Sequence, residues 1–115
     1  MKLQAQVFIA VGTAMALALL WVAGQPGAGE MFPGRWHSIA HFVTFAVLAA
    51  VWTLGLPRIP VLATVAGVVA FGFLHEACEI RGHAHGFEFY DAIIDGLGAI
   101  AGSLSVRFYS SAFTG

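Results

Sequence analysis

Four long apolar segments, separated by three short breaks, make up almost the whole of this sequence. The first break, residues 25–35, holds two prolines and three glycines, the second reads Leu-Pro-Arg-Ile-Pro at 56–60, and the third reads Arg-Gly-His-Ala-His-Gly at 81–86. Proline and glycine interrupt helices and favour turns. We therefore predict helices at about 5–24, 36–56, 60–80 and 87–108, each close to the ~20 residues that span the hydrocarbon of a bilayer.

Of the 115 residues, 59% are hydrophobic and 10% are charged, whereas soluble proteins carry ~25% charged residues. A core this small could not bury so much apolar surface in water, but lipid accepts it. The chain is therefore expected to form one domain, residues 1–115, with an all-α fold that is a transmembrane four-helix bundle. The short second and third breaks make consecutive helices neighbours, so an antiparallel up-down arrangement is predicted.

The basic residues predict the orientation. Lys2, Arg58 and Arg107 lie on the side of the two termini, and Arg35 and Arg81 lie on the other side. Segments rich in Lys and Arg stay on the cytoplasmic side of a membrane. By three basic residues to two, both termini are predicted to be cytoplasmic. The apolar segments make the lipid bilayer an expected partner. The sequence has only five basic residues and no basic patch, so nucleic acid is not an expected partner.

Ionisable side chains gather on the side away from the termini. All six acidic residues and all five histidines fall near the first and third breaks, and such groups at bilayer depth are costly and mark functional sites. Residues three or four apart share one face of a helix, so polar faces of three helices are expected to meet at one level. The predicted ligand site is His41, Glu76, Glu79, Asp91 and Asp95, with His37, His75, Arg81, His83 and His85 as secondary members.

Two interpretations of this cluster remain open. Carboxylates so close together require protonation, histidinium or arginine partners, or a bound cation. In the first interpretation, the groups form a hydrogen-bond network that holds the helices together, with His41 paired to Glu76 or Asp91. In the second, the cluster binds a ligand or a cation directly.

A divalent metal ion is the sharpest form of the second interpretation. His75, Glu79 and His83 offer imidazole and carboxylate ligands of the kinds that suit zinc. Their spacing is not the H-E-x-x-H of metalloproteases, because Glu79 stands where the second histidine is required. Haem ligation by His41 is not favoured, because its neighbour His37 lies on the same helix and not on a facing one. A divalent cation is thus the one cofactor that the residue types suit.

Two stripes of small residues are predicted to let the helices approach closely. Gly98 and Gly102 form a G-x-x-x-G pair in the fourth segment, and Ala63, Gly67 and Ala70 form a stripe in the third. Membrane helices associate by close packing of their backbones, which small residues permit. Both stripes are therefore expected to face into the bundle.

The order of polar residues and glycines resembles the VanZ-like family of small polytopic membrane proteins. The third segment carries Glu76-x-x-Glu79 where the family pattern has Glu-x-x-Gln, and residues Asp91 to Gly102 read Asp-x-x-x-Asp-x-x-Gly-x-x-x-Gly where the family has Asp-x-x-x-Asn-x-x-Gly-x-x-x-Gly. The stretch that ends in His41-Phe is also similar to the opening of the family's second helix. This resemblance covers nearly the whole chain and implies a multi-pass protein of the bacterial inner (cytoplasmic) membrane.

This sequence departs from the family pattern at several polar positions. Trp36 and His37 stand where the family usually has aspartate and lysine, and Glu79 and Asp95 replace glutamine and asparagine. The site is therefore more acidic than the family pattern. The arginine that the family often has just before the fourth helix is absent, and histidines lie nearby instead. The family is named for an accessory protein of glycopeptide-antibiotic resistance.

Two functions of different kinds are compatible with these residues. The first is a non-catalytic accessory or assembly subunit that binds a membrane partner within a larger complex. It is favoured because the sequence shows no classical catalytic triad, and Ser38 is at a helix start. The alternative is an envelope-facing protein that binds a lipid headgroup or a cation, or an enzyme of antibiotic-response type, and that uses the acidic and histidine pocket.

Overall fold

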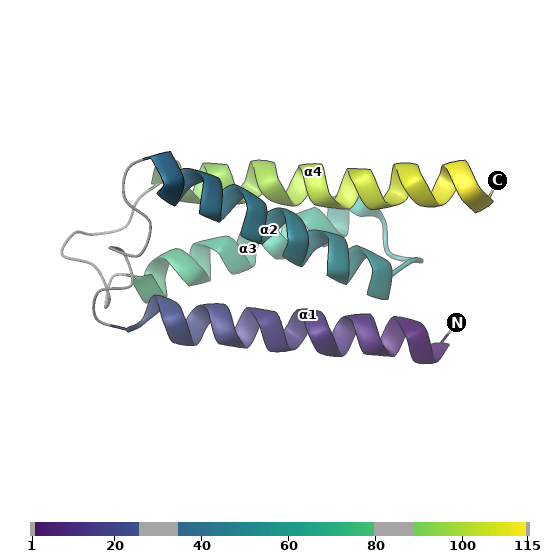
Figure 1. The fold of residues 1–115 in the computed structure, drawn as a ribbon, viewed down its shortest axis with the longest axis horizontal. Helices are drawn as coiled ribbons and strands as arrows, with labels where there is room; N and C mark the ends of the chain where they lie inside the picture. The colour runs from purple at the N-terminus through teal and green to yellow at the C-terminus, as the bar shows by residue number, and fades with distance from the viewer. Residues whose placement is uncertain (1, 26–34, 80–88, 115) are drawn as a thin grey trace.

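A computed structural model describes residues 2–25, 35–79 and 89–114. This part of the chain is all-α and forms four helices: α1 (Lys2–Ala23), α2 (Arg35–Gly55), α3 (Val61–Glu79) and α4 (Phe89–Thr114). The bundle is elongated, and Figure 1 shows that the N-terminus and the C-terminus lie at the same end of its long axis. The prediction of four helices is confirmed. The last helix ends six residues later than predicted, because no proline or glycine follows Gly102 until Gly115.

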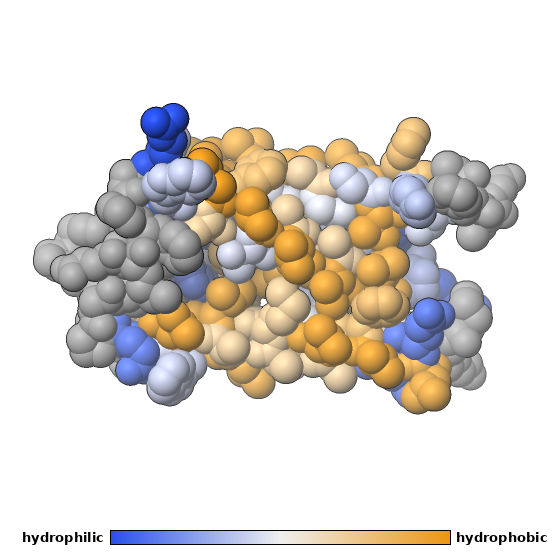
Figure 2. All heavy atoms as spheres, viewed as in Figure 1, coloured by the Kyte–Doolittle hydropathy of each residue, from blue (hydrophilic) through white to orange (hydrophobic). Residues whose placement is uncertain are grey.

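Each of the four helices found in the described residues is long enough and apolar enough to cross a membrane. Large apolar side chains point outward, and Leu62 and Phe108 are 81% and 79% exposed. In Figure 2 apolar residues cover most of the middle of the visible face, and hydrophilic residues lie mainly near the two ends. Such a surface is stable against lipid and not against water. These features are those of a multi-pass membrane protein.

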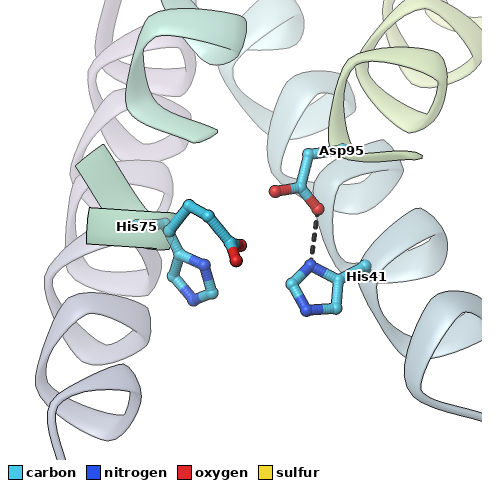
Figure 3. A group of neighbouring side chains, drawn as sticks. His41, His75 and Asp95 are labelled. Carbon is cyan, nitrogen blue, oxygen red and sulfur yellow. Dashed lines mark hydrogen bonds and ion pairs between the residues drawn. The ribbon is translucent and has the colours of Figure 1, made fainter. Parts of the chain in front are cut away.

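Helix α2 lies at the centre and contacts α1, α3 and α4. Residues that come later in α2 contact residues that come later in α4, so these two helices run in the same direction. The pairs, from the first turn of α2 to the residue after its end, are His37 with Asp91, His41 with Asp95 (Figure 3), Thr53 with Ser103, and Leu56 with Arg107.

The glycines of α4 set how closely it approaches α2. A Cβ atom added at Gly98 would meet the carbonyl oxygen of Phe42, and one added at Gly102 would meet that of Ala46. Larger residues at these positions would push the two backbones apart. The predicted packing role of this G-x-x-x-G pair is therefore confirmed, and its partner is α2.

The small residues of α3 do not pack in this way. Ala63, Gly67 and Ala70 are exposed, and a Cβ atom added at Gly67 would meet nothing within 4 Å. The prediction that this stripe faces into the bundle is wrong. A helix can turn only one face inward, and α3 buries the face that carries His75 and Glu76. Burial of these polar groups in the bundle keeps them away from lipid, where they are more costly.

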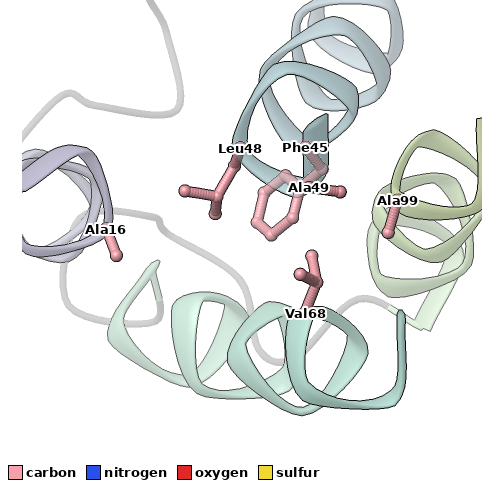
Figure 4. Packing of buried hydrophobic residues seen from close by; sticks show 6 residues of the cluster. All are labelled: Ala16, Phe45, Leu48, Ala49, Val68 and Ala99. Carbon is pink, nitrogen blue, oxygen red and sulfur yellow. The ribbon is translucent and has the colours of Figure 1, made fainter. Parts of the chain in front are cut away.

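The apolar core lies between all four helices, and Figure 4 shows side chains from each of them converging there. Phe45 and Leu48 are its largest members, and both are essentially fully buried. The ring of Phe45 lies parallel to that of His41, with centroids 6.4 Å apart and an interplanar angle of 3°. The core therefore begins directly beneath the polar residues of α2. Its members are Ala16, Phe45, Leu48, Ala49, Val68 and Ala99.

Candidate functional site

Two histidines of α2 face two aspartates of α4. The Nε2 atom of His37 lies 3.0 Å from Oδ2 of Asp91, and the Nδ1 atom of His41 lies 2.7 Å from Oδ1 of Asp95. The two contacts lie one helical turn apart, because the two histidines are four residues apart on α2 and the two aspartates are four residues apart on α4. Since α2 and α4 run in the same direction, this equal spacing brings both pairs into register.

His41 lies between the two carboxylates. Its Nδ1 atom contacts Asp95, and its Nε2 atom is 3.8 Å from Oδ2 of Asp91. When Asp95 is ionised, its carboxylate can only accept, so the Nδ1–H of His41 is the donor. Of the two partners predicted for His41, Asp91 lies within ion-pair distance, but the register between α2 and α4 puts Asp95 closer than Asp91.

Helix α3 completes the cluster from the opposite side. His75 and Glu76 are buried, and the ring of His75 meets that of His41 edge-on with centroids 5.8 Å apart. Figure 3 shows the imidazoles of His75 and His41 approaching each other from α3 and α2, with Asp95 beside His41. A Cβ atom added at Gly72 would lie 3.4 Å from Cβ of Asp95, so α3 and α4 are close together beside the cluster.

Four buried residues from three helices could hold a metal ion together. Each of His41, His75, Glu76 and Asp95 offers one ligand atom, and these atoms all lie within 4.8 Å of one another. We call these four residues the inner group. The Oδ2 atom of Asp95 is buried and makes no hydrogen bond within the described part of the chain. This oxygen is therefore available to a ligand, although the other oxygen of the carboxylate is bound to His41.

A second set of possible ligands overlaps the first. His37, His41 and Asp91 also offer atoms within 4.8 Å of one another, and we call them the outer group. The side chain of His37 is 24% exposed, whereas that of Asp91 is 4% exposed. The outer group thus extends from the bundle surface to the ring of His41, which both groups share.

The structure brings together most of the predicted site. The described cluster contains His41, Glu76, Asp91 and Asp95 of the primary set, and His37 and His75 of the secondary set. The side chain of Glu79 lies outside the described residues, as do Arg81, His83 and His85.

Of the predicted metal ligands His75, Glu79 and His83, only the side chain of His75 lies within the described residues. Within the described residues, His75 lies with His41, Glu76 and Asp95. All four residues belong to the polar cluster predicted from the sequence, but the predicted metal set of His75, Glu79 and His83 left out the other three. His37 and His41 are four residues apart, as are Asp91 and Asp95. This equal spacing was the signal that could have indicated the contact between His41 and Asp95.

Comparison of the chain with protein families, with curated proteins and with solved structures gives no match.

Proposed function

We propose that this chain is a membrane protein that binds one divalent transition-metal ion of the zinc type at the inner group. One observation carries the proposal: ligand atoms of two histidines and two carboxylates, all buried and drawn from three helices, lie within 4.8 Å of one another. Imidazole nitrogen and carboxylate oxygen are the ligands that zinc and similar ions take in proteins. Four protein ligands would fill a tetrahedral site.

The dimensions of the inner group suit such an ion after a small contraction. Ligands ~2.0–2.2 Å from zinc lie roughly 3.3–3.6 Å from one another in a tetrahedron. The ligand atoms here all lie within 4.8 Å of one another, so small rotations of the side chains would close the group around the ion. The Oδ2 atom of Asp95 supports this, because it has no hydrogen-bond partner among the described residues and a buried oxygen of this kind gains most from a ligand.

Electrostatics also favours a cation. Glu76, Asp91 and Asp95 are 2%, 3% and 1% exposed, and a buried carboxylate without a counter-charge is strongly destabilising. Among the described residues, both aspartates form ion pairs with histidines of α2. An imidazole supplies a positive charge only when it is protonated. A divalent ion would supply positive charge whatever the protonation of these histidines.

The test is a zinc titration of the full chain in lipid nanodiscs after removal of metal with a chelator. We expect one zinc ion per chain and a zinc-dependent rise in thermal stability, since an ion that binds only the folded state stabilises it. The His75→Gln variant should lose more than the ~10–100-fold in affinity that loss of an outer-shell partner costs.

The matched control is Thr64→Val, which removes another buried polar group from α3 outside the inner group. It should bind zinc as the wild type does. The proposal is wrong if the wild type binds no zinc, or if His75→Gln binds it unchanged.

We further propose that the helices cross the membrane in antiparallel up-down order, with both termini cytoplasmic, as in a VanZ-like protein of the bacterial inner membrane. The two chain ends lie together in Figure 1, in keeping with this order. A single cysteine at Arg35 or Arg58, both exposed, would test it in a Cys78→Ser background. An impermeant thiol reagent added outside intact cells should label position 35 and not position 58, and the reverse result would invert the orientation.

A second candidate function is an accessory or assembly subunit of a larger membrane complex. It is favoured by the exposed stripe of Ala63, Gly67 and Ala70 on α3, because small residues let another membrane helix approach closely. Gly67→Leu should release a copurifying membrane partner without altering zinc binding. Leu97→Phe, on the exposed surface of α4, is the control. Purification of the wild type without any partner would remove this candidate.

A further inference from the structure

We infer that the outer group is the position through which the metal ion enters and leaves the inner group. This inference rests on the proposed metal binding and adds a route to it. The outer group consists of His37, His41 and Asp91. Its role would be kinetic, because it would hold the ion only on the way to the four buried ligands.

Exposure gives the direction of the route. The side chain of His37 is 24% exposed, whereas His41, His75, Glu76 and Asp95 are at most 7% exposed. An ion that reaches the inner group must lose its water before it is fully coordinated by protein. Among the described residues, the outer group offers the partly exposed ligand His37, whose Nε2 atom lies 3.0 Å from Oδ2 of the buried Asp91.

The opposite approach is closed by apolar side chains. Phe45 is 1% exposed and its ring is parallel to that of His41. Leu48 and Val68 lie deeper in the same cluster (Figure 4), and both are essentially fully buried. An ion that crossed this core would lose its hydration without any polar ligand, which is very costly. Passage through the core is therefore much less favourable than passage along the histidines and aspartates.

His41 connects the two groups. Its Nδ1 atom is 2.7 Å from Oδ1 of Asp95, which belongs to the inner group, and its Nε2 atom is 3.8 Å from Oδ2 of Asp91, which belongs to the outer group. The two nitrogens of one imidazole thus face the two positions. An ion that moves between them can gain the ligands of one group while it still contacts the ring that both share.

The number of ligands differs between the groups in the way that transfer requires. The inner group offers four protein ligands and the outer group offers three. Sites with four protein ligands hold zinc in place, whereas sites with three keep a position for water or an incoming ligand. The outer group is therefore suited to exchange, and the inner group to retention.

A stopping point on a route changes rates and leaves the final equilibrium unaltered. Loss of His37, which belongs to the outer group alone, should therefore slow zinc uptake and zinc release by the same factor, and the dissociation constant of the inner group should stay the same. A ligand of the inner group behaves differently, because its loss raises the dissociation constant. This contrast separates an entry position from a ligand of the final site.

The experiment measures zinc uptake and chelator-driven zinc release by stopped flow, together with equilibrium titration, on the full chain in nanodiscs. The variants are His37→Gln and Asp91→Asn, which remove one outer ligand each from different helices, and Ser38→Ala is the control beside His37. We expect both outer variants to slow zinc uptake by about tenfold or more, since ~1.4 kcal/mol added to a barrier slows a step tenfold. In His37→Gln, zinc release should slow by the same factor, and zinc stoichiometry and affinity should equal those of the wild type. Asp91→Asn also removes a buried carboxylate 3.8 Å from the inner ligand His41, so its zinc affinity should fall as well.

Other outcomes have separate meanings. Unchanged rates in both outer variants would overturn the entry route while the proposed metal binding stands. Loss of equilibrium affinity in His37→Gln would make His37 a ligand of the final site and would also overturn it. Absence of zinc binding by the wild type would overturn the proposed function itself, and the inference with it. If one outer variant does not fold, the other still decides between these outcomes.

Discussion

The interface between α2 and α4 has polar contacts near both of its ends, and their chemistry differs. At one end, which we call the site end, His37 and His41 face two buried aspartates. At the other, which we call the turn end, Thr53 and Ser103 bond to each other and Arg107 bonds to backbone carbonyls of the turn after α2. Both ends join the same two helices, so packing alone does not explain the ionisable groups of the site end.

The turn end satisfies its own polar atoms. The hydroxyl of Thr53 lies 2.6 Å from the carbonyl oxygen of Ala49 and 2.8 Å from the hydroxyl of Ser103. Arg107 donates to the carbonyl oxygens of Leu56 and Ile59 at 2.8 and 2.5 Å. These neutral or charge-assisted contacts join helices at modest cost. The turn end is therefore a structural joint.

The site end leaves a buried charge to be balanced. Asp95 is 1% exposed and its Oδ2 atom makes no hydrogen bond to any of the residues that the structure describes, although hydroxyl or amide side chains could have joined the helices there without any charge. The contact with His41 joins the helices, but a joint does not need the second, unbonded oxygen, whereas a cation site can use it. This difference between the two ends supports the proposed ligand binding at the site end.

The largest effect is expected from His41→Leu. This change leaves the Asp95 carboxylate buried without its hydrogen-bond donor, and removal of one partner of a buried pair typically costs ~3–5 kcal/mol of unfolding free energy. The double variant His41→Leu, Asp95→Leu should recover much of this loss, because no unpaired charge remains. Thermal or denaturant unfolding of metal-free protein measures both. Equal stability of wild type and single variant would contradict the role given to this pair.

An intermediate effect is expected from Arg107→Met at the turn end. The variant loses two charge-assisted hydrogen bonds, to the carbonyl oxygens of Leu56 and Ile59. Such bonds contribute ~1.5–3 kcal/mol each to the unfolding free energy. The exposed bond to Ile59 should contribute less than the part-buried bond to Leu56. Arg58→Met, an exposed residue of the same turn, should change stability little. Zinc affinity should be unaltered in both. A large loss of zinc binding in Arg107→Met would remove the distinction between the two ends.

The smallest effect is expected from the hydroxyl pair. Thr53→Val leaves the buried hydroxyl of Ser103 without this partner and should cost about 1–3 kcal/mol of unfolding free energy. The double variant with Ser103→Ala should be closer to the wild type, because both partners are then apolar. Unfolding of the four proteins forms a double-mutant cycle. Additive losses would mean that the two hydroxyls do not interact.

The sequence predicted the helices because apolar runs of nearly 20 residues between Pro and Gly breaks leave few alternatives in a membrane. The rotation of α3 was not predictable in the same way. Its small-residue stripe and its His75–Glu76 face compete for the interior, and only the assembled bundle decides between them. Burial of the ionisable face costs less than its exposure to lipid, and therefore Gly67 points outward.

The partner of His41 was equally hard to predict. It depends on the register between α2 and α4, which are not adjacent in the sequence and are separated by the whole of α3. The side chains of Glu76 and Asp95 both fall within reach of α2 at the predicted level, and helical periodicity does not rank them. The backbone contact at Gly98 and Gly102 sets the register and brings Asp95 to 2.7 Å from His41.

The most direct test of the account is the X-ray absorption spectrum of the full chain loaded with one equivalent of zinc. The inner group predicts a first shell of two imidazole nitrogens and two carboxylate oxygens at ~2.0–2.2 Å, with multiple-scattering features from two histidine rings. A sulfur ligand at ~2.3 Å, such as the thiolate of Cys78, would contradict the account. So would a shell of water oxygens without any imidazole.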